Sequence, residues 1–261
     1  MADPLVDVAA LEGVPEAVDD ARAAVDLLLR HRVLRLRAGE VAAESSLRGG
    51  RASAALEGDD VPLERVRSGE TSAPGVQGAL RIGAEVSVLL PMWAKAPRQV
   101  LARLHVLAAA TVLPADACGR PRTGPPSHDP LGLGGAPPPE EVLARLDALV
   151  PLLTRETSAP AVVLGAVVHG ELLALRPFAW GNGLVARAAE RLTLVACGLD
   201  PKAVGIPEVG HLERSASYAQ SIRAYATGRP EGVATWVRHC AAAVALGARE
   251  STAICQALLR G

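Results

Sequence analysis

The chain has 261 residues, of which 49% are hydrophobic and 2% aromatic, and its formal net charge is −1. A chain of this length can bury a full core as one large domain or as one domain with an extension. A near-neutral charge and scattered aromatic residues argue against a surface that binds nucleic acid, and no such partner is predicted. Because Ala, Leu and Val must build most of the core, we expect an all-α fold.

The sequence predicts a cytoplasmic, reduced protein without a membrane partner. Its longest uncharged apolar stretch, residues 159–168, is too short for a bilayer, which takes about 20 residues to cross. The N-terminus lacks a basic start followed by an apolar run, so no signal peptide is expected. The four cysteines form no CxxC pair and are predicted to be small core or near-core residues: Cys118, Cys197, Cys240 and Cys255.

The N-terminal third carries the first helical patterns. Apolar residues at spacings of three and four predict an amphipathic helix over residues 18–29. After a polar, glycine-containing interval, a short helix is predicted over residues 52–56, stopping at Gly58, with a second helix starting near Pro62.

The middle of the chain alternates dense apolar segments with a loop. Residues 84–113 predict two or three helices that are broken at Pro91 and Pro97. Residues 119–139 are rich in Gly and Pro and predict a long loop, a kind of segment that is usually functional. A helix follows over residues 140–155, with two carboxylates in its first turn.

The last third predicts four helices. The first covers residues 160–175 and ends before a proline, and the second covers residues 183–196 with Gly198 behind it. Two more helices are expected over residues 211–228 and 231–259, separated by a Gly-Arg-Pro sequence.

Between two of these helices lies the stretch RPFAWGNGLVAR, in which a Gly-Asn-Gly turn precedes a helix. Glycines at a helix start present several free N–H groups, and the helix dipole adds positive potential there, so such a turn binds phosphate. Gly181 and Gly183 permit the required dihedrals, Asn182 can fix the turn or reach a ligand oxygen, and Arg187 lies one helical turn further on the same side. The stretch offers no general base and no metal ligand.

The stretch resembles the motif of the Fic (filamentation induced by cyclic AMP) family, HPFx(D/E)GNGRxxR. The family's preceding HxxFxxI pattern is matched in position by His169, Leu172 and Leu175. Residues 103–122 resemble the helix and turn before the family's flap, and residues 138–150 resemble the helix after it.

The resemblance implies a helical Fic-like core over residues 98–248. It further implies an N-terminal helical extension over residues 1–97, a C-terminal helix end over residues 249–261, and a Gly/Pro-rich flap loop within residues 119–139.

Three departures from the motif affect the chemistry. In Fic enzymes the motif His takes a proton from a target hydroxyl, which attacks the α-phosphate of ATP and leaves AMP on the protein. Here that position is Arg176, and a guanidinium stays protonated and cannot be a general base. Trp180 replaces the acidic residue that holds magnesium, and Leu184 replaces the first motif Arg.

The resemblance therefore implies an impaired transferase that keeps a phosphate-binding turn. We expect Arg176 to contribute a fixed positive charge and ATP or another nucleotide to bind without magnesium, with no metal and no other cofactor predicted. Two histidines are candidates for a replacement base. His169 lies about 10 Å along the helix from Arg176 and is expected to be a packing residue, whereas His128 lies in the loop that replaces the flap.

A second pattern of the family occurs near the N-terminus. SAALEG, from Ser53 through Glu57 to Gly58, matches the inhibitory helix (S/T)xxxE(G/N). In the family this Glu pairs with the second motif Arg and keeps the ATP γ-phosphate from its productive place, which here implies a pair between Glu57 and Arg187. Alternatively, the pair only ties the N-terminal helices to the core, an interpretation we favour because the pocket has little chemistry left to inhibit.

Two alternatives to the impaired transferase stay open. One is an active nucleotidyl or phosphoryl transferase in which Arg176 and Arg187 hold the phosphates and the base comes from the substrate or the flap. The other is a structural interaction module whose cleft is closed by Trp180. A nucleotide and a protein are thus the expected partners, and the oligomeric state is not predicted.

Overall fold

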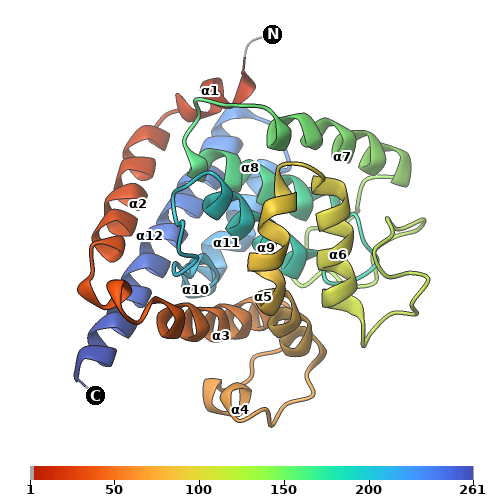
Figure 1. Ribbon diagram of the computed structural model, residues 1–261. Coiled ribbons are helices and arrows are strands. Elements are labelled where there is room, and N and C mark those ends of the chain that lie inside the picture. The colour runs from red at the N-terminus through yellow and green to blue at the C-terminus, as the bar shows by residue number, and fades with distance from the viewer. Residues whose placement is uncertain (1–2, 261) are drawn as a thin grey trace.

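The computed structural model describes residues 3–260 and confirms the all-α prediction, since these residues form twelve α-helices, one 3-10 helix (η1) and no strand. Figure 1 shows the helices gathered around α8, with the chain termini on the outside. The elements are α1 (Pro4–Ala9), α2 (Val14–Leu29), η1 (Arg32–Arg35), α3 (Ala38–Leu56), α4 (Leu63–Arg67), α5 (Pro74–Trp93), α6 (Pro97–Ala109), α7 (Pro139–Thr154), α8 (Ala161–Leu175), α9 (Asn182–Ala196), α10 (Pro207–Glu213), α11 (Ser215–Tyr225) and α12 (Pro230–Arg260).

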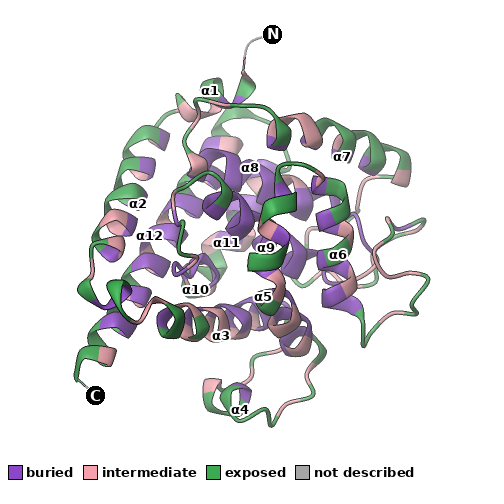
Figure 2. Cartoon of the chain, viewed as in Figure 1, coloured by how far each residue is buried: buried purple, intermediate pink, exposed green. Residues whose placement is uncertain are grey.

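The centre of the core consists of α8 and α9, which pack along each other. A helix that is apolar all round is stable only when it is enclosed, and α8 is buried along nearly its whole length (Figure 2). α9 is buried as well, although it carries Arg187, Glu190 and Arg191. Because buried charges need partners, α9 is where polar networks must be sought.

Small residues allow the C-terminal helices to approach closely. A Cβ on Gly210 of α10 would lie 2.2 Å from the carbonyl oxygen of Ala243 in α12. On the opposite side of the same crossing, a Cβ on Gly247 would lie 2.2 Å from the carbonyl oxygen of Ile206. Glycine is therefore required at both points, and the backbones of α10 and α12 pack against each other without intervening side chains.

Several predicted boundaries in the N-terminal half are wrong. α2 begins at Val14 and α5 at Pro74, before the predicted starts at residues 18 and 84. The short helix over residues 52–56 is the end of α3, which begins at Ala38 and includes the glycine-containing interval. Gly49 lies inside this helix at a crowded contact, where a Cβ would lie 3.1 Å from both the Arg191 and the Glu208 side chains. Pro91 does not break α5, because it lies in the last turn and removes only a terminal hydrogen bond.

Other boundaries agree with the sequence prediction. α7, α8 and α9 begin and end within about a residue of their predicted limits, and residues 110–138 form no helix. The predicted helix over residues 211–228 is split at Arg214 into α10 and α11, whereas α12 continues unbroken to Arg260. The short α1 was not predicted.

The described residues contain no helix that is both long and apolar enough to cross a membrane. All four cysteines are free thiols. Cys240 and Cys255 are buried and Cys118 is half-buried, but Cys197 is exposed at the end of α9, which corrects the expectation of a near-core position for all four.

Candidate functional site

The Gly-Asn-Gly turn lies between α8 and α9 and is fixed by its own side chain. Gly181 precedes α9 with a φ of 71°, a left-handed conformation that favours glycine. The Asn182 amide donates to the carbonyl oxygen of Phe178 at 2.8 Å, and its side-chain oxygen accepts from the Phe178 N–H at 2.9 Å. Asn182 therefore holds the loop closed, and both ends of its amide are engaged within the protein.

Arg187 and Glu57 form the buried pair that the sequence pattern implied. Arg187 Nη2 lies 2.7 Å from Glu57 Oε1, and the two residues are 1% and 6% exposed. Arg187 also donates from Nε to Ser53 Oγ at 2.8 Å and from Nη2 to the Ser53 carbonyl oxygen at 2.9 Å. Its remaining nitrogen, Nη1, donates to the Tyr218 hydroxyl at 3.2 Å, so every guanidinium nitrogen has a partner.

The carboxylate of Glu57 lies against the first turn of α9. A Cβ added to Gly183 would be 2.0 Å from Glu57 Oε1, so only glycine allows this approach. Glu57 is the C-cap residue of α3. Gly58, which follows it with a φ of 101°, turns the chain away from the helix axis. An anionic group thus occupies the helix N-terminus where the sequence predicts phosphate.

Arg176, at the position of the family's catalytic His, is bound to the flap. Its guanidinium donates to the carbonyl oxygens of Gly134 at 2.8 Å and Gly135 at 2.9 Å, and it lies 3.1 Å from Asp129 Oδ2. The residue has a left-handed backbone, with a φ of 45°, and is 4% exposed. Its charge is neutralised by the flap and does not point into open solvent.

A second arginine holds the flap to the same turn. Arg122 donates from Nε to the Arg176 carbonyl oxygen at 2.7 Å and from Nη2 to the Pro137 carbonyl oxygen at 2.7 Å. Its backbone N–H donates to the Pro177 carbonyl oxygen at 2.8 Å. Burial, and then the positive charge of Arg176, lower the pKa of Arg122. The turn from Gly119 to Arg122, which precedes the flap, thus fixes the flap to the loop between α8 and α9.

The structure separates the two histidines that were candidate bases. His128 Nε2 lies 3.0 Å from the Glu57 carbonyl oxygen, and its ring stacks on Trp180 with centroids 6.1 Å apart. His169 lies in the core, with Nε2 2.8 Å from the Tyr218 hydroxyl, and burial lowers its pKa to about 4. Only His128 of the two is therefore near the turn.

Little space remains at this site. The cavity there has a volume of about 20 Å³ and is lined by residues of α3, the flap, α8 and the turn, among them Glu57, His128, Asp129, Arg176, Asn182 and Gly183. Such a volume holds about one water molecule, so a nucleotide cannot enter while Glu57 and the flap stay in place. Trp180 does not line this cavity. The side chain of Glu57 and the flap residues close it instead.

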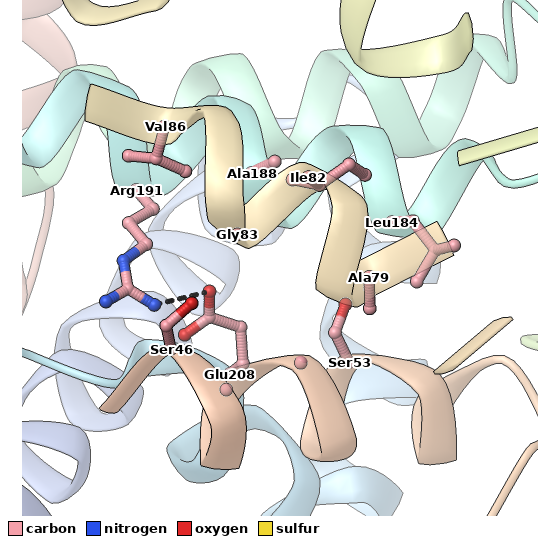
Figure 3. Close-up of a pocket in the computed structure, with 12 residues that line it drawn as sticks. Ser46, Ser53, Ala79, Ile82, Gly83, Val86, Leu184, Ala188, Arg191 and Glu208 are labelled. Atoms are coloured by element: carbon pink, nitrogen blue, oxygen red, sulfur yellow. Dashed lines mark hydrogen bonds and ion pairs between the residues drawn. The ribbon is translucent and has the colours of Figure 1, made fainter. Parts of the chain in front are cut away.

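A second enclosed space lies between α3, α5 and α9 and is equally small, at about 20 Å³. Figure 3 shows Ser46 and Ser53 of α3 facing Ala79 and Ile82 of α5 across it, with the Arg191–Glu208 pair at one end. This space separates closely packed helices and is too small for a ligand.

Sequence reasoning missed two residues of the site. Asp129 pairs with Arg176 from the flap, and Tyr218 accepts a hydrogen bond from Arg187. Neither belongs to a spacing pattern, because each reaches the turn from a segment distant in sequence. The one sequence signal for Tyr218 was its residue type, a tyrosine in an amphipathic helix of a chain with few aromatic residues.

Solved structures with the same architecture come from bacteria and an animal. A Fic family protein from Desulfovibrio desulfuricans superposes with a TM-score of 0.72 at 21% identity, covering 91% of this chain and 74% of that one. Fic-1 from C. elegans gives a TM-score of 0.69 at 17% identity, covering 93% and 73%.

A third structure extends the agreement to a whole chain. A Fic domain containing signaling protein from Bacteroides thetaiotaomicron gives a TM-score of 0.70 at 15% identity, covering 92% of this chain and 98% of that one. No protein-family model matches the sequence, and no curated protein matches it significantly. The agreement is therefore one of three-dimensional structure, and it shows that this chain has the Fic fold.

Proposed function

We propose that the protein binds the phosphate group of a nucleotide at the N-terminus of α9 and does not transfer AMP. The observation that supports this most strongly is the position of the Glu57 carboxylate. It lies against Gly183, at the start of a helix, and is held by Arg187. An internal anion thus occupies the place where an external anion is expected.

The groups around Glu57 fit a phosphate as well as a carboxylate. Both anions pair with a guanidinium through charge-assisted hydrogen bonds, and both are favoured at a helix N-terminus. Gly183 adds no side chain to this place, so the space now taken by Glu57 Oε1 opens when the Glu57 side chain moves away. Glu57 therefore competes with the nucleotide and keeps the site closed while no nucleotide is bound.

The groups needed for transfer are missing or engaged elsewhere. Arg176 cannot accept a proton and is bound to Asp129 and the flap carbonyls. Trp180 offers no ligand for magnesium. General-base catalysis commonly contributes about 10² to 10⁴ in rate, and a bound metal adds further stabilisation, so turnover without both is negligible.

Calorimetric titration tests the binding half of the proposal. We expect ATP, ADP, AMP or GTP, with or without magnesium, to bind the Glu57→Gly variant at least tenfold more tightly than the unaltered protein, because no internal anion has to be displaced. Asp60→Gly, an acidic residue removed three positions away on the surface, should leave the affinity unchanged.

Arg187→Met in the Glu57→Gly background should abolish binding, because the cation that holds the phosphate is lost. If none of the four nucleotides produces heat with Glu57→Gly, the phosphate-binding proposal is wrong. The filled cleft would then favour the structural interaction module, whose partner is a protein.

Intact-mass spectrometry tests the absence of transfer. After incubation with ATP and magnesium, the protein and added target proteins should keep their masses. An added AMP on any of them would contradict the proposal and favour the transferase with altered chemistry.

A further inference from the structure

Four helices each contribute one side chain to a buried polar cluster behind the candidate site. The residues are His169 of α8, Glu190 of α9, His211 of α10 and Cys240 of α12, and one donor atom from each lies within 4.8 Å of the other three. None is more than 1% exposed. This set of donors has no part in the function proposed above.

We propose that these four side chains, the zinc-binding cluster, hold one Zn²⁺ ion that ties α8, α9, α10 and α12 together. Two imidazoles, a carboxylate and a thiolate make a four-ligand set of the kind that zinc accepts in tetrahedral geometry. Mg²⁺ and Ca²⁺ prefer oxygen ligands and do not fit a site with two nitrogens and a sulfur. With Glu190 and Cys240 both anionic, the ion makes the cluster neutral overall, as its apolar surroundings require.

The first supporting observation is a buried nitrogen that lacks a hydrogen-bond partner. His169 Nδ1 lies 2.8 Å from Glu190 Oε2 without forming a hydrogen bond of regular geometry. His211 Nε2 approaches the same carboxylate oxygen at 2.9 Å. Two ring nitrogens that share a cation with this carboxylate would account for the arrangement, whereas an unsatisfied buried N–H is rare in folded proteins.

The second observation concerns the other nitrogen of each histidine. His169 Nε2 lies 2.8 Å from the Tyr218 hydroxyl, and His211 Nδ1 lies 3.1 Å from His239 Nε2. His239 is held in turn by Ser217 Oγ at 3.1 Å from Nδ1. Histidines that bind metals are usually oriented through their second nitrogen in this way.

Binding requires small adjustments. Zinc–ligand bonds of about 2.0 to 2.3 Å place tetrahedral ligands about 3.4 Å apart, so the pairs at 2.8 and 2.9 Å must open by about half an ångström, and donor atoms separated by up to 4.8 Å must approach one another. The Cys240 thiol loses its proton to solvent as the Zn–S bond forms. Because all four positions are taken by protein and none is open to a substrate, the site is structural.

Metal analysis of the purified protein tests the proposal. The protein is unfolded and refolded with zinc, dialysed against a chelator in the folded state, and analysed by plasma mass spectrometry. We expect one zinc per chain, retained by the folded protein and released on unfolding. Cys240→Ala should lose the zinc, whereas Cys255→Ala, which removes another buried thiol of α12, should keep it.

Cobalt binding by the unaltered protein supplies a second measurement, which does not require any variant to fold. Protein refolded with Co²⁺ should show the visible bands of tetrahedral cobalt and a thiolate-to-cobalt charge-transfer band. His239→Gln, which disturbs the support of His211, should weaken metal affinity roughly 10 to 100-fold while leaving the cobalt spectrum tetrahedral.

Absence of zinc above the buffer blank in the refolded wild-type protein would overturn the proposal. So would equal zinc contents in Cys240→Ala and Cys255→Ala, or a cobalt spectrum without the charge-transfer band. None of these outcomes bears on nucleotide binding, which is tested separately.

Discussion

The N-terminal end of α9 and its middle are both rich in buried charge, but they are held in different ways. At the N-terminal end, Arg187 is paired with Glu57 at the very end of α3, and Arg176, just before the turn, is paired with Asp129 of the flap. In the middle, Glu190 is surrounded by side chains of the central and C-terminal helices. A side chain at a helix end and a surface loop can move without dismantling the core, whereas helices that pack backbone to backbone cannot separate.

This difference separates a site that can open from one that cannot. Glu57 can be replaced by an external anion, since Arg187 stays in place on α9 to receive it. The Glu190 carboxylate cannot be replaced by an external anion, because α10 and α12 contact each other backbone to backbone at glycines and leave no space for one. Changes at the N-terminal end and in the middle of α9 should therefore affect stability and ligand access differently.

The largest expected effect comes from removing the cation at the N-terminal end. Arg187→Met leaves the Glu57 carboxylate buried without its partner and should lower the free energy of unfolding by about 3 to 5 kcal/mol in urea titrations. Adding Glu57→Gln should restore part of the loss, because no buried charge is then left unpaired. A loss as small as that of an exposed ion pair would show that solvent reaches Glu57.

The second-largest effect is a dependence of the free energy of unfolding on pH, which a buried histidine causes. His105 is fully buried, stacks on Phe178 with ring centroids 4.1 Å apart, and accepts a hydrogen bond at Nδ1 from the Gly119 N–H at 2.8 Å. Burial lowers its pKa from 6.5 to about 4, so the unfolded chain binds the proton more readily than the folded protein.

The contribution of neutral His105 to the free energy of unfolding is therefore fully present above pH 6.5. It is lost as the pH falls from 6.5 toward 4, by about 3 kcal/mol in total. Unfolding free energies measured across this range should fall less steeply for His105→Gln than for the unaltered protein. Identical slopes would show that His105 is not the group responsible.

A smaller effect is expected at the flap. Asp129→Asn weakens the contact with Arg176, and because the Asp129 side chain is partly exposed the loss should be about 1 kcal/mol. Hydrogen exchange over residues 120–138 should become faster, while exchange in α8 stays slow. Faster exchange throughout α8 would mean that the flap and the core open together, against the distinction drawn above.

The smallest effect is expected at the surface. Arg98 and Asp147 link α6 and α7 with 44% and 64% of their side chains exposed. Arg98→Ala should change the free energy of unfolding by about 0.5 kcal/mol or less, because exposed pairs are screened and mobile. A change comparable to that of Arg187→Met would remove the contrast between buried and exposed pairs.

Local patterns predicted the parts of the molecule that depend on neighbouring residues. The limits of α8 and α9 follow from apolar periodicity and from the glycines and proline beside them. The pair between Glu57 and Arg187 was implied by two short motifs and is present at 2.7 Å. The start of α3 was missed because Gly49 suggests a loop in sequence but meets a crowded helix contact in space.

Long-range contacts left no comparable trace in the sequence. Arg176 and Asp129 are brought together by the course of a loop without periodicity, so their pairing follows only from the folded structure. The zinc-binding cluster draws one residue from each of four helices, and no close spacing of cysteines in the sequence indicates it.

The crystal structure of Glu57→Gly grown with ATP tests the central claim most directly. We expect a phosphate group against Gly183 at the start of α9, within hydrogen-bond distance of Arg187. A nucleotide bound elsewhere, or a structure in which that place stays empty at saturating ATP, would contradict the assignment of this turn as a phosphate site.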